Sequence, residues 1–162
     1  MIMQHILNSI NAQTRKKIIL DTDAYNEIDD QFAIAYAMLS PDKIDLLSIN
    51  AAPFLNNRST SPKEGMEKSY DEIFNIMRLT DPSRDIPVYK GSETFLKSKT
   101  EPVESDAADN IIKTAMESDE LVYVVAIGAI TNVASAIIKR PEIINKIAVI
   151  WLGGHALHYR DT

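Results

Sequence analysis

The sequence has no cysteine, few basic residues and no long apolar run. The lack of cysteine excludes disulfides and thiolate metal sites, and it is typical of proteins from a reducing compartment. Lys and Arg together number 17 against 23 Asp and Glu, which gives a formal charge of −6. This deficit argues against a nucleic-acid-binding surface, because contacts with phosphates need clustered Lys and Arg. We therefore expect a small-molecule ligand.

No apolar stretch reaches the length of a membrane span. Residues 1–16 have neither the leading positive charge nor the uninterrupted apolar core of a signal peptide. We expect a cytoplasmic location and no contact with a membrane. We interpret residues 1–16 as an N-terminal arm without an assigned function, and residues 17–162 as one domain, because the chain has the 45% hydrophobic and 25% charged residues of an ordinary globular protein.

Short apolar runs alternate with amphipathic helical patterns along this domain. The runs that predict strands are 18–20, 44–50, 86–89, 121–127 and 147–152. The patterns that predict helices are about 29–39, 62–79, 106–117 and 132–139, with Ser61, Ser105 and Thr131 as N-caps. This alternation favours an α/β fold, a mostly parallel open sheet with helices on both faces.

Five acidic residues occupy ten positions directly after the first predicted strand: Asp21, Asp23, Glu27, Asp29 and Asp30. Carboxylates this close repel one another unless a cation binds or their protonation shifts. Ligands of open α/β sheets bind at the C-terminal ends of strands, so we expect a hard divalent ion such as calcium or magnesium here. A simpler interpretation is that Asp29 or Asp30 caps the helix and the other acids are solvated. The spacing excludes an EF-hand loop.

Four separated segments resemble the inosine-uridine-preferring nucleoside hydrolases. They are Asp21-Thr22-Asp23 with Asp29-Asp30, the polar loop 51–61, Gly128-Ala129-Ile130-Thr131-Asn132, and Gly153-Gly154 after the last strand. Residues 24–28 stand where the commoner pattern has Pro-Gly and one more residue, so this is a variant of the acidic motif. A haloacid-dehalogenase-type phosphatase also has Asp-x-Asp after its first strand, with Asp21 then the nucleophile and Asp23 the acid. Nothing in that family requires the second acidic pair.

The resemblance implies hydrolysis of the N-glycosidic bond of ribonucleosides by a calcium-activated water, as in purine and pyrimidine salvage. Asp23 would be general base and calcium ligand. Asp30 and the backbone carbonyl of Ile127 would also bind calcium, with Asp21 or Glu27 as a further ligand. Asn56 or its neighbour Asn57 would align the water. Asp29 and Leu152 would contact the ribose.

Members of this family are about twice as long as this chain. The resemblance therefore implies the N-terminal portion of the family fold, without its C-terminal part, and half of the site. An alternative is a catalytically incomplete fragment that binds calcium or pairs with another chain, and homo-oligomers are also expected in this family. His155 and His158 are further candidates for an acid or a metal ligand, although unpaired histidines are more often incidental.

Overall fold

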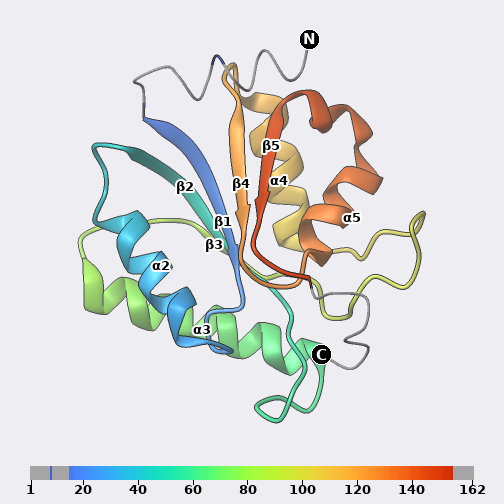
Figure 1. The fold of residues 1–162 in the computed structure, drawn as a ribbon, viewed down its shortest axis with the longest axis horizontal. Helices are drawn as coiled ribbons and strands as arrows, with labels where there is room; N and C mark the ends of the chain where they lie inside the picture. The colour runs from blue at the N-terminus through green and yellow to red at the C-terminus, as the bar shows by residue number, and fades with distance from the viewer. Residues whose placement is uncertain (1–7, 9–14, 155–162) are drawn as a thin grey trace.

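The computed structural model describes residue 8 and residues 15–154, which fold around a parallel sheet (Figure 1). Its strands are β1 (Lys16–Thr22), β2 (Ile44–Ala51), β3 (Val88–Tyr89), β4 (Val122–Ala126) and β5 (Ile147–Trp151). Their spatial order is β3-β2-β1-β4-β5, and each neighbouring pair is parallel. The predicted parallel α/β sheet is confirmed.

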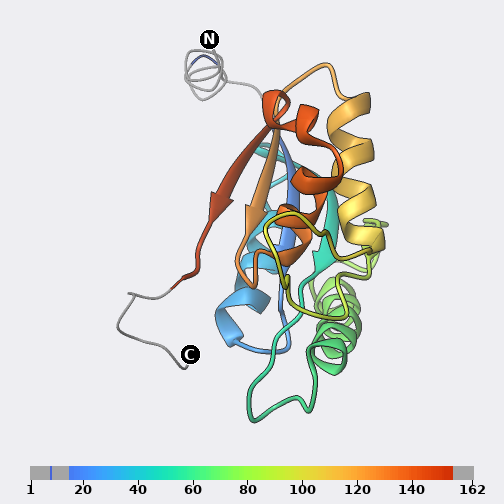
Figure 2. The same ribbon diagram turned by 90° about the vertical axis from the view of Figure 1, so that its right-hand side faces the viewer.

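The described helices are α2 (Ile28–Met38), α3 (Pro62–Thr80), α4 (Asp106–Glu117) and α5 (Thr131–Lys139), and the 3-10 helix η1 (Pro141–Asn145) precedes β5. One core cluster joins α2 and α3 to Leu20 of β1, and a second joins α4 and α5 to Ile19. Because Ile19 and Leu20 are adjacent in a strand, they point to opposite faces, so helices cover both. Figure 2 shows α4 and α5 together on one side of the sheet.

The order in which the chain adds strands to the sheet reverses between β1 and β4. The chain runs outward from β1 through β2 to β3, then returns to the other side of β1 as β4 and continues to β5. Such a switch point, at the C-terminal ends of the strands, is where open α/β sheets bind ligands. Here β1 ends in Asp21 and Thr22, and Asp23 follows.

A β-bulge changes the register between β1 and β2. Ile18 pairs with Leu46, but Ile19 pairs with Ser48. The extra residue reverses which face the following side chains of β2 point to. Asn110 of α4 consequently donates hydrogen bonds to Ser48 Oγ and Asn50 Oδ1, at 2.8 and 3.2 Å. The bulge thus places Asn50 beside Asp21, its partner in the register.

Several predicted details need correction. The N-cap of α2 is Glu27, so neither Asp29 nor Asp30 caps that helix, and the simpler interpretation of these acids is wrong. The N-cap of α5 is Ile130 rather than Thr131. The apolar composition of run 147–152 is typical of a strand that is buried on both faces. β5 is nevertheless buried only at its start, because it is the edge strand of the described sheet. β1 begins at Lys16, and residues 1–7 and 9–14 of the predicted arm lie outside the described residues.

Ser61 and Ser105 are N-caps as predicted, and their side chains accept hydrogen bonds from the backbone N–H groups of Glu64 and Ala108. Within the described residues, no helix combines the length and the apolar character that crossing a membrane requires.

The cap at the start of α3 gives a test of the fold. Ser61→Ala removes the acceptor for the Glu64 N–H, so we expect the free energy of unfolding to fall by about 1 kcal/mol in urea denaturation. Ser61→Asp keeps an acceptor oxygen and should remain close to wild type. Equal losses in both variants would show that the capping hydrogen bond is not what stabilises the helix start.

Candidate active site

Three carboxylates lie buried where β1 ends and α2 begins. The side chains of Asp21, Asp23 and Asp30 are 0%, 6% and 3% exposed. Asp21 is in β1, Asp23 follows that strand, and Asp30 lies in the first turn of α2. Three acids of the motif therefore lie buried at the switch point, whereas Glu27, the N-cap of α2, and Asp29, in the first turn of that helix, are exposed.

Burial makes these carboxylates hard to ionise. It raises the pKa of Asp21 and of Asp30 to about 7, and that of Asp23 to about 6. Hydrogen bonds from neutral side chains lower these pKa values in part, and the neighbouring negative charges raise them further. Among the described residues, no ion pair with Lys or Arg involves these three acids. A bound cation would therefore relieve an unfavourable arrangement.

Asn132 holds the carboxylate of Asp21. Its Nδ2 donates to Asp21 Oδ2 at 2.9 Å and to the carbonyl of Ala51 at 3.1 Å. Its Oδ1 accepts hydrogen bonds from the backbone N–H and the hydroxyl of Ser92, both at 2.8 Å. One amide thus joins the ends of β1 and β2 to α5 and to the loop after β3. Among the residues that the structure describes, none is a hydrogen-bond partner of the buried Asp21 Oδ1.

Asp30 is held from β1, because the hydroxyl of Thr22 donates a hydrogen bond to its Oδ1. Its position in the first turn of α2 also places the carboxylate at the positive end of the helix dipole. Thr22 and Asp30 thereby connect the strand to the helix that follows the acidic turn.

The loop after β4 passes directly against these acids. The N–H of Ile127 donates to the backbone carbonyl of Asp21 at 2.8 Å. A Cβ atom added to Gly128 would lie 2.8 Å from Asp23 Oδ1, so any side chain there would displace the carboxylate. The structure thus brings Ile127, proposed from the resemblance as a carbonyl ligand, next to the acidic group.

The end of β5 joins the same edge of the sheet. The N–H of Leu152 donates to the carbonyl of Ala126 at 2.9 Å, and Trp151 Nε1 donates to the carbonyl of Gly128 at 3.1 Å. The side chain of Leu152 is 68% exposed. The backbone of Leu152 is therefore bonded to Ala126, the residue of β4 that pairs with Asp21. His155 and His158 lie outside the described residues.

Asn56 reaches the site through a residue that sequence reasoning missed. Asn26, in the variant turn, donates to Asp23 Oδ2 at 3.0 Å and accepts from Asn56 Nδ2 at 2.6 Å. The feature of the sequence that could have indicated Asn26 is the turn 24–28, because it differs from the commoner Pro-Gly. Asn132 was also missed as a contact of Asp21, although it ends the Gly-x-x-Thr-Asn segment. Ser92 and Thr22 carried no such signal.

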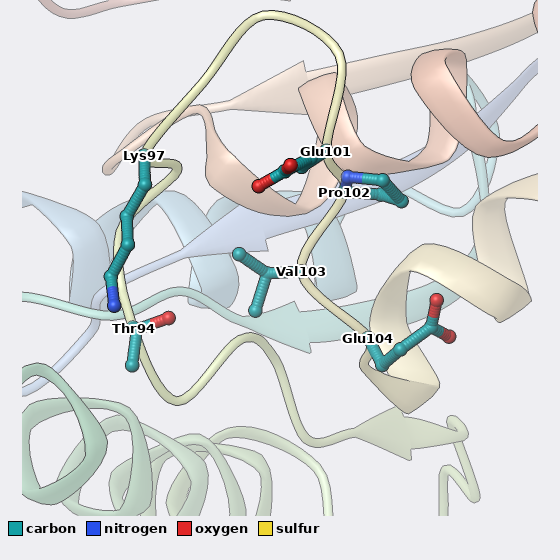
Figure 3. Close-up of a pocket in the computed structure, with 6 residues that line it drawn as sticks. All are labelled: Thr94, Lys97, Glu101, Pro102, Val103 and Glu104. Carbon is teal, nitrogen blue, oxygen red and sulfur yellow. The ribbon is translucent and has the colours of Figure 1, made fainter.

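The structure has two cavities of a size that could hold a small molecule. One, of about 420 Å³, is lined by Tyr25, Gln31, Arg58 and Glu72. The other, of about 300 Å³, is lined by Thr94, Lys97, Glu101, Pro102, Val103 and Glu104, within the loop between β3 and α4 (Figure 3). The first cavity is near the candidate site, because the guanidinium of Arg58, one of its lining residues, donates a hydrogen bond to the carbonyl of Asn26, whose side chain contacts Asp23.

The donors at this site fit a hard divalent cation in type. Asp21 Oδ1, which has no hydrogen-bond partner within the described part of the chain, and the buried carboxylates of Asp23 and Asp30 are oxygen ligands of the kind that calcium prefers. Within residues 15–154, however, no three acidic or histidine side chains converge closely enough to hold an ion together. A cation here would therefore also need backbone carbonyl or water oxygens.

Residues 18–161 match the inosine-uridine preferring nucleoside hydrolase family. The chain belongs to this family. It is 31% identical over 159 residues to probable uridine nucleosidase 2 of Arabidopsis thaliana, and 29% identical over 162 residues to pyrimidine-specific ribonucleoside hydrolase RihA of Escherichia coli. Each match covers 86% of this chain and 48% of the relative, so the chain spans about half the length of the curated relatives it matches.

Solved nucleoside hydrolases share the fold. A plant nucleoside hydrolase, PpNRh1, is 24% identical with a TM-score of 0.64 and covers 86% of this chain and 48% of its own. A purine-preferring ribonucleoside hydrolase from Gardnerella vaginalis is 25% identical, also with a TM-score of 0.64, over 86% of this chain and 49% of its own. The family resemblance is confirmed, and the phosphatase alternative has lost its support.

The buried acids predict that stability falls as pH rises. Their pKa values in the folded chain are above the ordinary value of 3.8, so the folded chain binds these protons more tightly than the unfolded chain. Their contribution to the free energy of unfolding is complete below pH about 4 and is lost between about 4 and 7. We expect the Tm in chelator, measured by circular dichroism, to be several degrees lower at pH 8 than at pH 5.

Asp21→Asn is neutral at every pH and should reduce this difference in Tm. Asp71→Asn, on the exposed surface of α3, is the matched control and should leave it unchanged. A decrease in the Tm of Asp21→Asn as steep as in wild type would contradict the assignment of the pH dependence to the buried acids.

Proposed function

We propose that this protein hydrolyses the N-glycosidic bond of ribonucleosides to free base and ribose. The observation that carries the proposal is the group of buried acids, Asp21, Asp23 and Asp30, at the switch point of the sheet, with Gly128 leaving room for the Asp23 carboxylate. Membership of the nucleoside hydrolase family supports a ribonucleoside substrate. The names of the relatives include pyrimidine and purine nucleosides, so we assign no base.

Asp23 is the general base in this proposal. Its carboxylate accepts a proton from the attacking water while the water oxygen bonds to the anomeric carbon. The carbon–nitrogen bond breaks, its electron pair leaves with the base, and the base takes up one proton from solvent, which balances the proton that Asp23 later returns to solvent. Without a cation, the pKa of Asp23 is about 6, so this carboxylate is mainly ionised at neutral pH yet basic enough to take the proton, and a bound cation would lower the pKa. The neighbouring carboxylates stabilise the positive charge that develops on the ribose.

Asn56, or its neighbour Asn57, aligns the water, and Asp29 and Leu152 contact the ribose. A calcium ion fits the oxygen donors of the site. It would be held by Asp23, Asp30 and the carbonyl of Ile127, with Asp21 or Glu27 as a further ligand. When bound, the ion would supply positive charge that orients the ribose hydroxyls and favours ionisation of the water.

The same proposal places the reaction in purine and pyrimidine salvage in the cytoplasm. The absence of cysteine supports a reducing compartment of this kind.

Release of reducing sugar from a mixed set of purine and pyrimidine nucleosides tests the activity. We expect release by the purified chain in calcium, loss in chelator, and recovery when calcium is added back. Asp23→Asn preserves the shape of the side chain but not its basicity, so the rate should fall by about 100-fold or more. The control Asp71→Asn should match wild type. A folded wild-type chain that releases no ribose would refute the activity for this chain.

A second candidate function is association with another polypeptide. β5 is the edge strand of the described sheet, and the side chains of Ile150 and Leu152 are 53% and 68% exposed. The outer side of α2 also exposes Phe32 and Tyr36, at 70% and 71%. Unpaired edge strands with apolar side chains readily pair with another chain. These surfaces favour a homo-oligomer.

Light scattering after size-exclusion chromatography tests this association. We expect wild type to have at least twice the mass of one chain, and Ile150→Lys to reduce the mass because it places a charge on the edge strand. Leu79→Lys changes an equally apolar, exposed residue at the end of α3 and should leave the mass unchanged. A monomeric wild type would rule out this second function.

A further inference from the structure

We infer that Asn26 is a positioning residue that joins the proposed general base to the residue proposed to align the water; this inference rests on the function proposed above. Asn26 Nδ2 donates a hydrogen bond to Asp23 Oδ2 at 3.0 Å. Asn56 Nδ2 donates to Asn26 Oδ1 at 2.6 Å. One amide therefore uses its donor on Asp23 and its acceptor on Asn56, so the two side chains are fixed relative to each other.

The backbone of the turn holds Asn26 in this position. Its N–H donates to the carbonyl of Asp23 at 2.6 Å, which closes the turn. Its own carbonyl accepts a hydrogen bond from the guanidinium of Arg58. The backbone N–H of Arg58 also donates to Asn56 Oδ1 at 2.9 Å. Arg58 thus contacts both asparagines of the bridge, and the Asn26 side chain is half-buried between the turn and the loop after β2.

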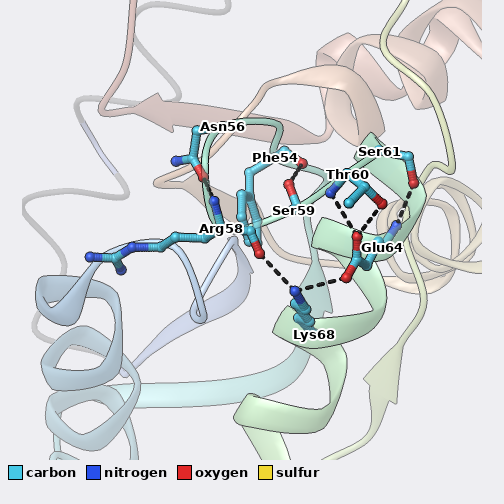
Figure 4. A network of polar contacts seen from close by, with 8 residues as sticks. All are labelled: Phe54, Asn56, Arg58, Ser59, Thr60, Ser61, Glu64 and Lys68. Carbon is cyan, nitrogen blue, oxygen red and sulfur yellow. Dashed lines mark hydrogen bonds and ion pairs between the residues drawn. The ribbon is translucent and has the colours of Figure 1, made fainter.

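The first turns of α3 support the loop that carries Asn56 (Figure 4). Lys68 Nζ donates to the carbonyl of Arg58 at 2.7 Å, and the carboxylate of Glu64 accepts from the backbone N–H of Thr60 at 2.6 Å. Lys68 and Glu64 also form an ion pair at 2.8 Å. The loop is therefore held by α3, and Asn26 is the connection from this loop to Asp23.

The chemistry of the turn explains why an asparagine is needed. The Pro-Gly of the commoner family pattern has no polar side-chain atom, so it cannot make either hydrogen bond. Alanine would lose both bonds. Aspartate would keep an acceptor for Asn56 but would lose the donor to Asp23 and place a second negative charge beside it. The longer turn 24–28 therefore introduces a side chain that the shorter turn lacks.

The test compares Asn26→Ala, Asn26→Asp, Asn56→Ala and the double variant Asn26→Ala with Asn56→Ala. Asn75→Ala is the matched control, because Asn75 on α3 also donates to one side chain, Glu72, and accepts from another, Arg78. The measurements are kcat and KM for ribose release, the Tm, and the NMR signals of the Asn56 side-chain amide in 15N-labelled protein.

We expect Asn26→Ala to lower kcat by about 10-fold with little change in KM, because Asp23 and Asn56 act on the water rather than on substrate binding. Asn26→Asp should be at least as impaired. The double variant should be no worse than the poorer single variant, since both changes break one connection. The Tm should stay within about 2 °C of wild type, and Asn75→Ala should behave as wild type.

Unchanged kcat in Asn26→Ala, with an active wild type, would overturn the inference and leave the proposed function intact. Ribose release absent from wild type would refute the proposed function instead, and the NMR signals would then decide the inference. The Asn56 amide signals should shift and exchange faster with solvent in Asn26→Ala but not in Asn75→Ala. Signals that stay in place in Asn26→Ala would overturn it.

Discussion

The side-chain amide of Asn132 is bonded to the carboxylate of Asp21, which has no contact with solvent. The same amide contacts the carbonyl of Ala51 and receives two hydrogen bonds from Ser92, so the ends of β1 and β2 and the loop after β3 are fixed by one residue of α5. A Cβ atom on Gly91 would lie 1.9 Å from the Ala51 carbonyl and would also meet Asn132. This close approach brings the loop after β3 to the acidic group.

The positions of the strands and helices followed from local patterns, because apolar periodicity and capping residues act over a few neighbouring positions. The acidic motif could be placed at a strand end for the same reason. Its contacts could not be predicted, since Asn132 is 111 positions from Asp21 in the sequence. The bulge between Leu46 and Ser48 could not be predicted either, because a shift of the register by one residue does not change the composition of the strand.

The exposed side of β5 shows where composition and structure disagree. The sequence of this strand, IAVIW, is typical of a parallel strand that is buried on both faces. In the described sheet β5 is at the edge, and Ile150 is half exposed. The apolar composition of a strand indicates that the strand is suited to burial, but it does not indicate which other segment or chain covers the strand. The proposed association would give these side chains the contact that their composition favours.

The buried acids connect stability to function. With burial and like charges raising their pKa values, Asp21, Asp23 and Asp30 are favourable in the folded chain only when protonated or neutralised by a cation. A ligand that binds the folded chain at 100 times its Kd stabilises it by about 2.7 kcal/mol. Protons and a cation therefore compete for the same oxygens. Burial of ionised carboxylates destabilises the folded chain at neutral pH, and binding of a cation offsets that destabilisation. The same burial therefore favours binding of a cation.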